Sequence, residues 1–138
     1  MFRKIAVVAM LIALVVAMLP TSGVLAGRGT NQELEKKWDQ LVTNFNRQNL
    51  DHNKAHKWVD AWLMNEKPKA TEKEAVMRHL TICNTALMDA HSIVARHEGF
   101  DAKGKVIKPN LAYQSIKVLA NALQRHAASV KNLKADLR

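Results

Sequence analysis

Three segments of the chain place apolar residues three or four positions apart, which is the spacing of one face of an α-helix. The first segment follows Thr30-Asn31-Gln32-Glu33, which has the form of a helix-starting capping box. Its stripe consists of Leu34, Trp38, Leu41, Phe45, Gln48, His52, Ala55, Val59 and Trp62. The stripe weakens in the Asn-rich stretch 44–53, where Asp51 is able to cap a new helix. We therefore expect one long helix, or two helices if the segment breaks near Asp51.

The second helical segment starts beyond Pro68, because proline restrains the residue before it and cannot continue a helix. A second capping box, Thr71-Glu72-Lys73-Glu74, predicts a helix from about Glu72 to Glu98. Its stripe consists of Val76, Leu80, Cys83, Leu87, Ala90, Val94 and His97. Gly99 then suits a left-handed C-terminal position, and Phe100 is able to fold back on the last turn.

The third helical segment starts at Pro109-Asn110, after a linker without periodicity, and is expected to reach the C-terminus. Its stripe consists of Ala112, Ile116, Leu119, Leu123, His126, Val130, Leu133 and Leu137. Short linkers make successive helices antiparallel neighbours. The pattern predicts an all-α fold, a small up-down antiparallel bundle of three long helices, or of four if the first breaks near Asp51. We expect a single domain over residues 27–138.

The N-terminal segment has the three-part layout of a secretory signal peptide. Arg3 and Lys4 precede an apolar run over residues 5–19, and Val24-Leu25-Ala26 offers a cleavage site. We therefore expect a signal peptide over residues 1–26, cleavage after Ala26, and export to the periplasm or the extracellular space. The alternative is an uncleaved anchor, since residues 5–26 just reach across a bilayer of about 30 Å if Pro20 and Gly23 are tolerated in the spanning helix. Membrane insertion is expected only in that case.

Charge and cysteine content narrow the classes of partner. The formal net charge of the chain is +9, and it stays clearly positive without Arg3 and Lys4. A basic exported protein favours an anionic envelope surface, or another envelope protein, as its partner, whereas export argues against nucleic acid. Cys83 is the only cysteine, so no disulfide can form within the chain.

No catalytic motif is visible in the sequence. The chain lacks a Gly-rich phosphate loop, a His-Glu-x-x-His zinc motif, a nucleophile elbow and a Cys-x-x-Cys-His haem attachment. The carboxylates are scattered without an obvious pair for acid-base chemistry. We therefore expect a non-catalytic protein.

The histidines and the cysteine provide the sharpest hypothesis about chemistry. His52 and His56 are four residues apart on one helix, and His79 and Cys83 are four apart on the next, so each pair shares a helix face. With a rise of about 1.5 Å per residue, His56, Cys83 and His126 are all expected roughly 15 to 16 Å below the turn that joins the first two helices. Imidazole and thiolate bind copper or zinc. The spacing predicts a metal site formed by His52, His56, His79, Cys83 and His126.

Two other interpretations use the same residues. Cys83 can be a small buried apolar residue and His126 a core histidine bonded to a neighbour, with His52 and His56 facing solvent. Alternatively, a noncovalent haem can take His126 or His56 as one axial ligand, and a second ligand from Met77, Met88 or another histidine.

The sequence thus predicts an exported basic bundle that serves as a non-catalytic binding or structural module of the cell envelope, with a copper or zinc site. The alternatives are a noncovalent haem-binding bundle and a surface-associating protein without any ligand. Trp58, flanked by Lys54 and Lys57, is a candidate for an exposed aromatic and basic patch toward a partner or membrane surface.

Overall fold

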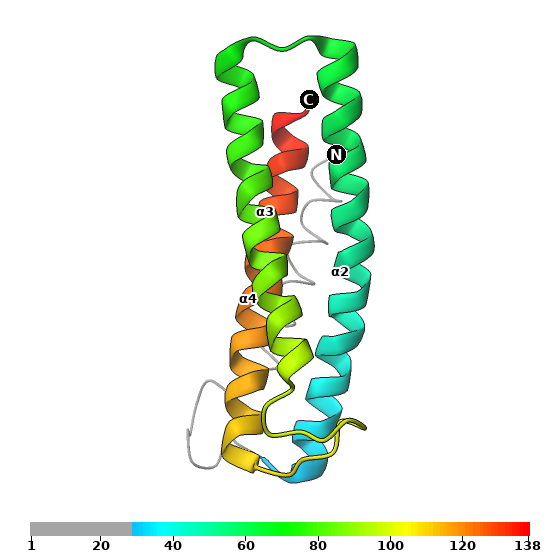
Figure 1. The fold of residues 1–138 in the computed structure, drawn as a ribbon, viewed down its shortest axis with the longest axis vertical. Coiled ribbons are helices and arrows are strands. Elements are labelled where there is room, and N and C mark those ends of the chain that lie inside the picture. Colours follow the sequence, from blue (N-terminus) through cyan, green and yellow to red (C-terminus); the bar gives the residue numbers. More distant parts are fainter. Residues whose placement is uncertain (1–28) are drawn as a thin grey trace, which may run out of the picture.

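The computed structural model describes residues 29–138, which form three long α-helices. These are α2 (Asn31–Glu66), α3 (Ala70–Arg96) and α4 (Pro109–Asp136). Figure 1 shows the helices side by side, with a tight turn between α2 and α3 at one end and a longer loop between α3 and α4 at the other. The expected all-α bundle is confirmed for these residues, none of whose helices is long and apolar enough to cross a bilayer. The predicted signal peptide, residues 1–26, lies outside the described residues.

Helix α2 runs without a break for 36 residues. The Glu33 amide donates a hydrogen bond of 3.2 Å to the hydroxyl of its N-cap, Thr30, as the first capping box predicts. Asp51 lies inside the helix, so the alternative of a break near this residue and a four-helix bundle is wrong. The reason is tertiary: Gln48 and His52 are hydrogen-bonded to α4, and such contacts override the weak helix propensity of the Asn-rich stretch.

The turn between α2 and α3 is shorter than the sequence indicates. Lys67 adopts a left-handed φ of 44° as the C-cap of α2, and only Pro68 separates it from Lys69, the N-cap of α3. No side chain caps α3, so the predicted capping box at residues 71–74 is wrong. Because the helix already begins at Ala70, Thr71 lies within its first turn and not in front of it.

The loop after α3 folds back onto both neighbouring helices. His97 is the left-handed C-cap of α3, and Gly99 follows with a φ of 89°. A Cβ atom at Gly99 would lie 2.1 Å from the Ala112 backbone nitrogen, so only glycine allows this close approach to α4. Phe100 is buried and stacks on Trp38, with ring centroids 4.6 Å apart. The left-handed conformation predicted at Gly99 is confirmed, although the helix itself already ends at His97, and Phe100 packs on α2 rather than on the last turn of α3.

Two clusters of buried apolar side chains form the core. The loop-end core, near the α3–α4 loop, consists of Leu34, Trp38, Leu41, Phe45, Ala90, Phe100, Ala112, Ile116, Leu119, Ala120, Ala122 and Leu123. The turn-end core, near the α2–α3 turn, consists of Ala55, Val59, Val76, Leu80, Cys83 and Leu133. Between the two clusters, α2 and α4 bury the polar residues Gln48, His126 and Ser129. The apolar interior is therefore interrupted by a polar layer.

Candidate metal centre

The polar layer is a connected network of side chains. Gln48 of α2 and His126 of α4 are buried, and His52 of α2 is half-buried. Ser129, also buried, donates to the backbone carbonyls of Arg125 and His126. Within residues 29–138, every buried side-chain nitrogen or oxygen atom has a hydrogen-bond partner. Polar groups in such a setting reinforce one another because the surrounding dielectric constant is low.

His126 lies at the centre of the layer with 0% of its surface exposed. Its Nδ1 is 2.8 Å from Gln48 Oε1, and its Nε2 is 3.0 Å from His52 Nδ1. The Gln48 amide nitrogen donates to Asn44 Oδ1 at 3.3 Å, which leaves Gln48 Oε1 as an acceptor. His126 therefore carries its proton on Nδ1 and offers the lone pair on Nε2 to His52.

The protonation of His126 also determines which nitrogen of His52 carries a proton. Because His52 Nδ1 donates to His126, His52 Nε2 carries a lone pair. His56 Nε2, one helical turn away, is 3.0 Å from His52 Nε2 and 3.0 Å from Asn84 Oδ1 of α3. Two imidazole nitrogens and one amide oxygen thus converge, and the proton of His56 Nε2 is shared between two acceptors.

Burial keeps the inner histidines neutral. The pKa of His126 is lowered to about 4, first by burial and second by the neighbouring His52, while Asp51 acts in the opposite direction. The pKa of His52 is lowered by burial and then by His56, and its hydrogen bond with Asn84 partly offsets this. Neutral imidazole is the form that binds a metal ion, so His52 needs no deprotonation at pH 7 to act as a ligand.

The converging atoms have the spacing of ligands to one ion. Imidazole nitrogens bind zinc at about 2.0 to 2.1 Å, so two nitrogens 3.0 Å apart reach the same ion at nearly a right angle. His56 would then carry its proton on Nδ1, and Asn84 Oδ1 would be the third ligand. No three His, Cys, Asp or Glu side chains of residues 29–138 are placed to hold one ion. Any site here consequently combines His52 and His56 with an amide oxygen and water.

His79 and Cys83, which the sequence groups with the other three histidines, lie apart from them. His79 Nδ1 pairs with Asp136 Oδ2 near the end of α4. Cys83 is buried in the turn-end core, where burial raises the pKa of its thiol and a hydrogen bond with Ser129 partly offsets the rise. The thiol therefore stays protonated, whereas the thiolate is the metal-binding form. From the predicted set, the structure brings together the three other histidines.

Gln48 and Asn84 belong to this network but not to the set of ligands predicted from the sequence. Gln48 could have been identified from the sequence, because it interrupts an apolar stripe and a buried amide needs a hydrogen-bond partner. Asn84 could not have been identified in this way, because it lies beside the apolar stripe of α3, where polar residues are usually exposed.

Comparisons of this chain with protein families, with curated proteins and with solved structures give no match.

Proposed function

We propose that this protein is an exported, non-catalytic binding module of the cell envelope that binds one copper or zinc ion at His52, His56 and Asn84. The observation that supports this most is the convergence of three electron-rich atoms within hydrogen-bond distance. A divalent cation interacts with all three lone pairs at once, which the single shared proton cannot do. Export is part of the proposal and rests on the sequence of residues 1–26.

His126 has a positioning role in this proposal and is not a ligand. Metal-bound histidines usually donate their second ring N–H to an acceptor, which fixes the tautomer and the ring orientation. His126 Nε2 is this acceptor for His52, and Gln48 holds His126 in turn. Because His126 is buried and neutral, its lone pair stays available over a wide pH range.

A haem is less well supported by the same residues. Its axial methionine would be Met77 or Met88, and both side chains are exposed, Met88 by 71%. His126, the candidate histidine ligand, has both ring nitrogens engaged in hydrogen bonds. A surface-associating protein without a ligand needs only the basic exterior, and it remains if no metal binds.

The test is a metal titration of the untagged protein purified after expression of the full chain. We expect about one equivalent of Cu²⁺ or Zn²⁺ to bind and to raise the melting temperature by mass action. His56→Ala should weaken binding by about tenfold or more, since it removes a ligand. The matched control is His91→Ala, because His91 is an exposed histidine of α3 whose ring lies beside that of Phe45, away from the proposed ligands.

Two variants separate the positioning role from a structural role. His126→Gln preserves an acceptor for His52 and should bind metal nearly as well as the parent, whereas His126→Leu removes the acceptor and should lose about 10- to 100-fold. Circular dichroism verifies that each variant is folded. The proposal fails if neither metal binds, or if His91→Ala weakens binding as much as His56→Ala. A Soret band in the purified protein would support haem in its place.

A further inference from the structure

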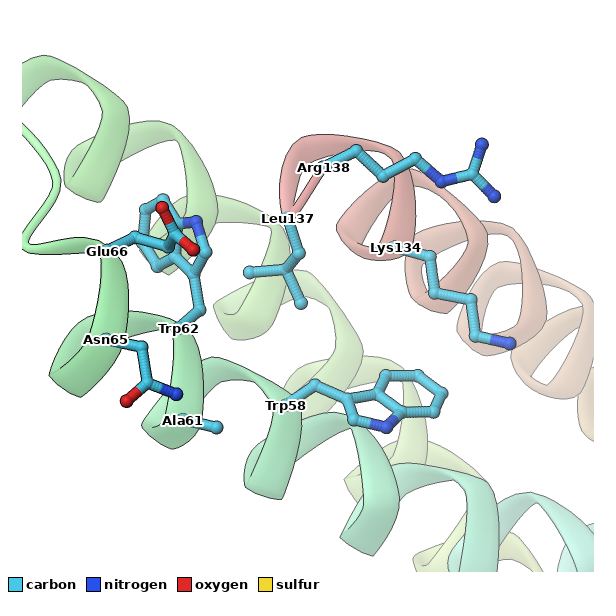
Figure 2. A pocket seen from close by; sticks show the side chains of 8 residues that line it. All are labelled: Trp58, Ala61, Trp62, Asn65, Glu66, Lys134, Leu137 and Arg138. Atoms are coloured by element: carbon cyan, nitrogen blue, oxygen red, sulfur yellow. The ribbon is translucent and has the colours of Figure 1, made fainter.

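A second feature of the molecule is a groove beside the turn-end core, between α2 and the last turn of α4. Figure 1 shows that α4 ends before the α2–α3 turn, which leaves the last turns of α2 partly uncovered. The groove has a volume of about 510 Å³. Trp58 and Trp62 are half-buried on its α2 side, where they pack against the turn-end core, and Leu137 points into it from α4 (Figure 2).

The groove carries its positive charge at one end. Lys134 and Arg138 extend from the end of α4, with Lys134 beside Trp58, whereas Glu66 lies beside Trp62 on the opposite side of the groove (Figure 2). The Lys134 Nζ lies 4.7 Å from the centroid of the Trp58 ring, and its N–H donors stay available to an anion. Asp136, the acid of the same turn of α4, pairs with His79 of α3.

We propose that this groove binds a single-chain amphiphile with an anionic head group, the chemistry of a fatty acid carboxylate. The head group lies between Lys134 and Arg138, where two cations supply complementary charge. The acyl chain lies on the indole rings of Trp58 and Trp62 and on Leu137. The volume falls within the range of about 300 to 1,000 Å³ that small-molecule sites occupy. This site does not depend on the metal centre.

The experiment uses the tryptophans as reporters of an acyl chain in the groove. Untagged protein purified after expression of the full chain is titrated with 12-bromododecanoate below its micellar concentration, because bromine quenches nearby indole fluorescence. We expect saturable quenching that dodecanoate reverses by competition and that dodecyltrimethylammonium, of equal chain length and opposite charge, does not. The double variant Lys134→Gln/Arg138→Gln should weaken binding by about tenfold, as expected for the loss of charge-assisted contacts.

The matched control is Lys117→Gln, because Lys117 lies 5.5 Å from the Tyr113 ring centroid in a second, distant cation–aromatic pair. This variant should bind dodecanoate like the parent. The variant Trp58→Phe keeps an aromatic floor and should retain binding with less total quenching. The proposal is overturned if quenching does not saturate, if both amphiphiles compete equally, or if only phosphatidylglycerol vesicles and not dodecanoate bind. The last result would assign the groove to a membrane surface.

Discussion

The loop-end core and the turn-end core are two unequal halves of one bundle. The loop-end core joins all three helices through large side chains, including the stacked pair Trp38 and Phe100. The turn-end core is smaller, and the tryptophans that pack against it, Trp58 and Trp62, are only partly buried. Apolar burial stabilises a fold roughly in proportion to its area, so we expect the loop end to be the more stable half.

The difference between the two cores indicates which part of the bundle a bound ligand would stabilise. The polar layer lies between the loop-end core and the turn-end core. Its hydrogen bonds connect α2 to α4 through His126 and α2 to α3 through Asn84. α2 has fewer contacts with α3 than with α4, so the hydrogen bond to Asn84 is a larger share of what holds α2 and α3 together. Both proposed ligands would act on the weaker half, where local opening costs least.

The largest expected effect comes from the same substitution in the two cores. Leu123 and Leu133 are both fully buried, one in each cluster. Leu123→Ala should destabilise the protein by about 2 to 5 kcal/mol, because it leaves a cavity among well-packed neighbours. Leu133→Ala should fall at the lower end of this range, since the half-buried Trp62 and Leu137 are able to move into the space. Urea unfolding measures both values, and a larger cost at Leu133 would contradict the comparison.

The next effect is acid destabilisation of the polar layer. The pKa of His126 is about 4 in the folded protein and near 6.5 in the unfolded chain. Between these values the unfolded chain binds more protons, so stability is fully present above pH 6.5 and falls as the pH drops to 4. The loss from this group is about 3 kcal/mol, and the lowered pKa of His52 adds to it in the same direction.

The variant His126→Gln tests this assignment, because glutamine does not titrate in this range. Its unfolding free energy, measured by urea at pH 7 and at pH 4.5, should vary much less than that of the parent. Equal pH dependence in the two proteins would mean that groups other than His126 dominate the acid response.

The periodic pattern predicted the helices better than it predicted their ends or the site. The stripes identified the buried faces because burial follows the helical repeat, as at Leu119 and Leu123. The continuity of α2 through Asp51 depends on bonds to α4, which no local pattern contains. Depth along the bundle placed His126 and Cys83 at one level, but height alone does not show on which side of its helix a residue lies. Cys83 consequently meets Ser129 and not the histidines.

Hydrogen exchange should resolve the two halves directly. Amides of residues 53–62, in the turn-end half of α2, should exchange faster than those of residues 34–45, because fewer buried side chains hold them. Bound Cu²⁺ or Zn²⁺ should slow exchange in the first range and leave the second nearly unchanged. Uniform protection along α2, with or without metal, would show that the bundle opens only as one unit.

The smallest expected effect concerns Cys83, which the sequence places among the ligands. In the structure its thiol is fully buried, and burial raises its pKa, which the neighbouring Ser129 only partly offsets. A protonated thiol competes poorly for copper or zinc, so Cys83→Ala should change the affinity for either metal by less than about twofold. The variant should still lose some stability, because it leaves a small space in the turn-end core. His56→Ala in the same titration is the reference for the loss of a ligand. If Cys83→Ala lowers the metal affinity as much as His56→Ala does, the thiol is a ligand, and α3 must rotate to bring Cys83 toward the polar layer.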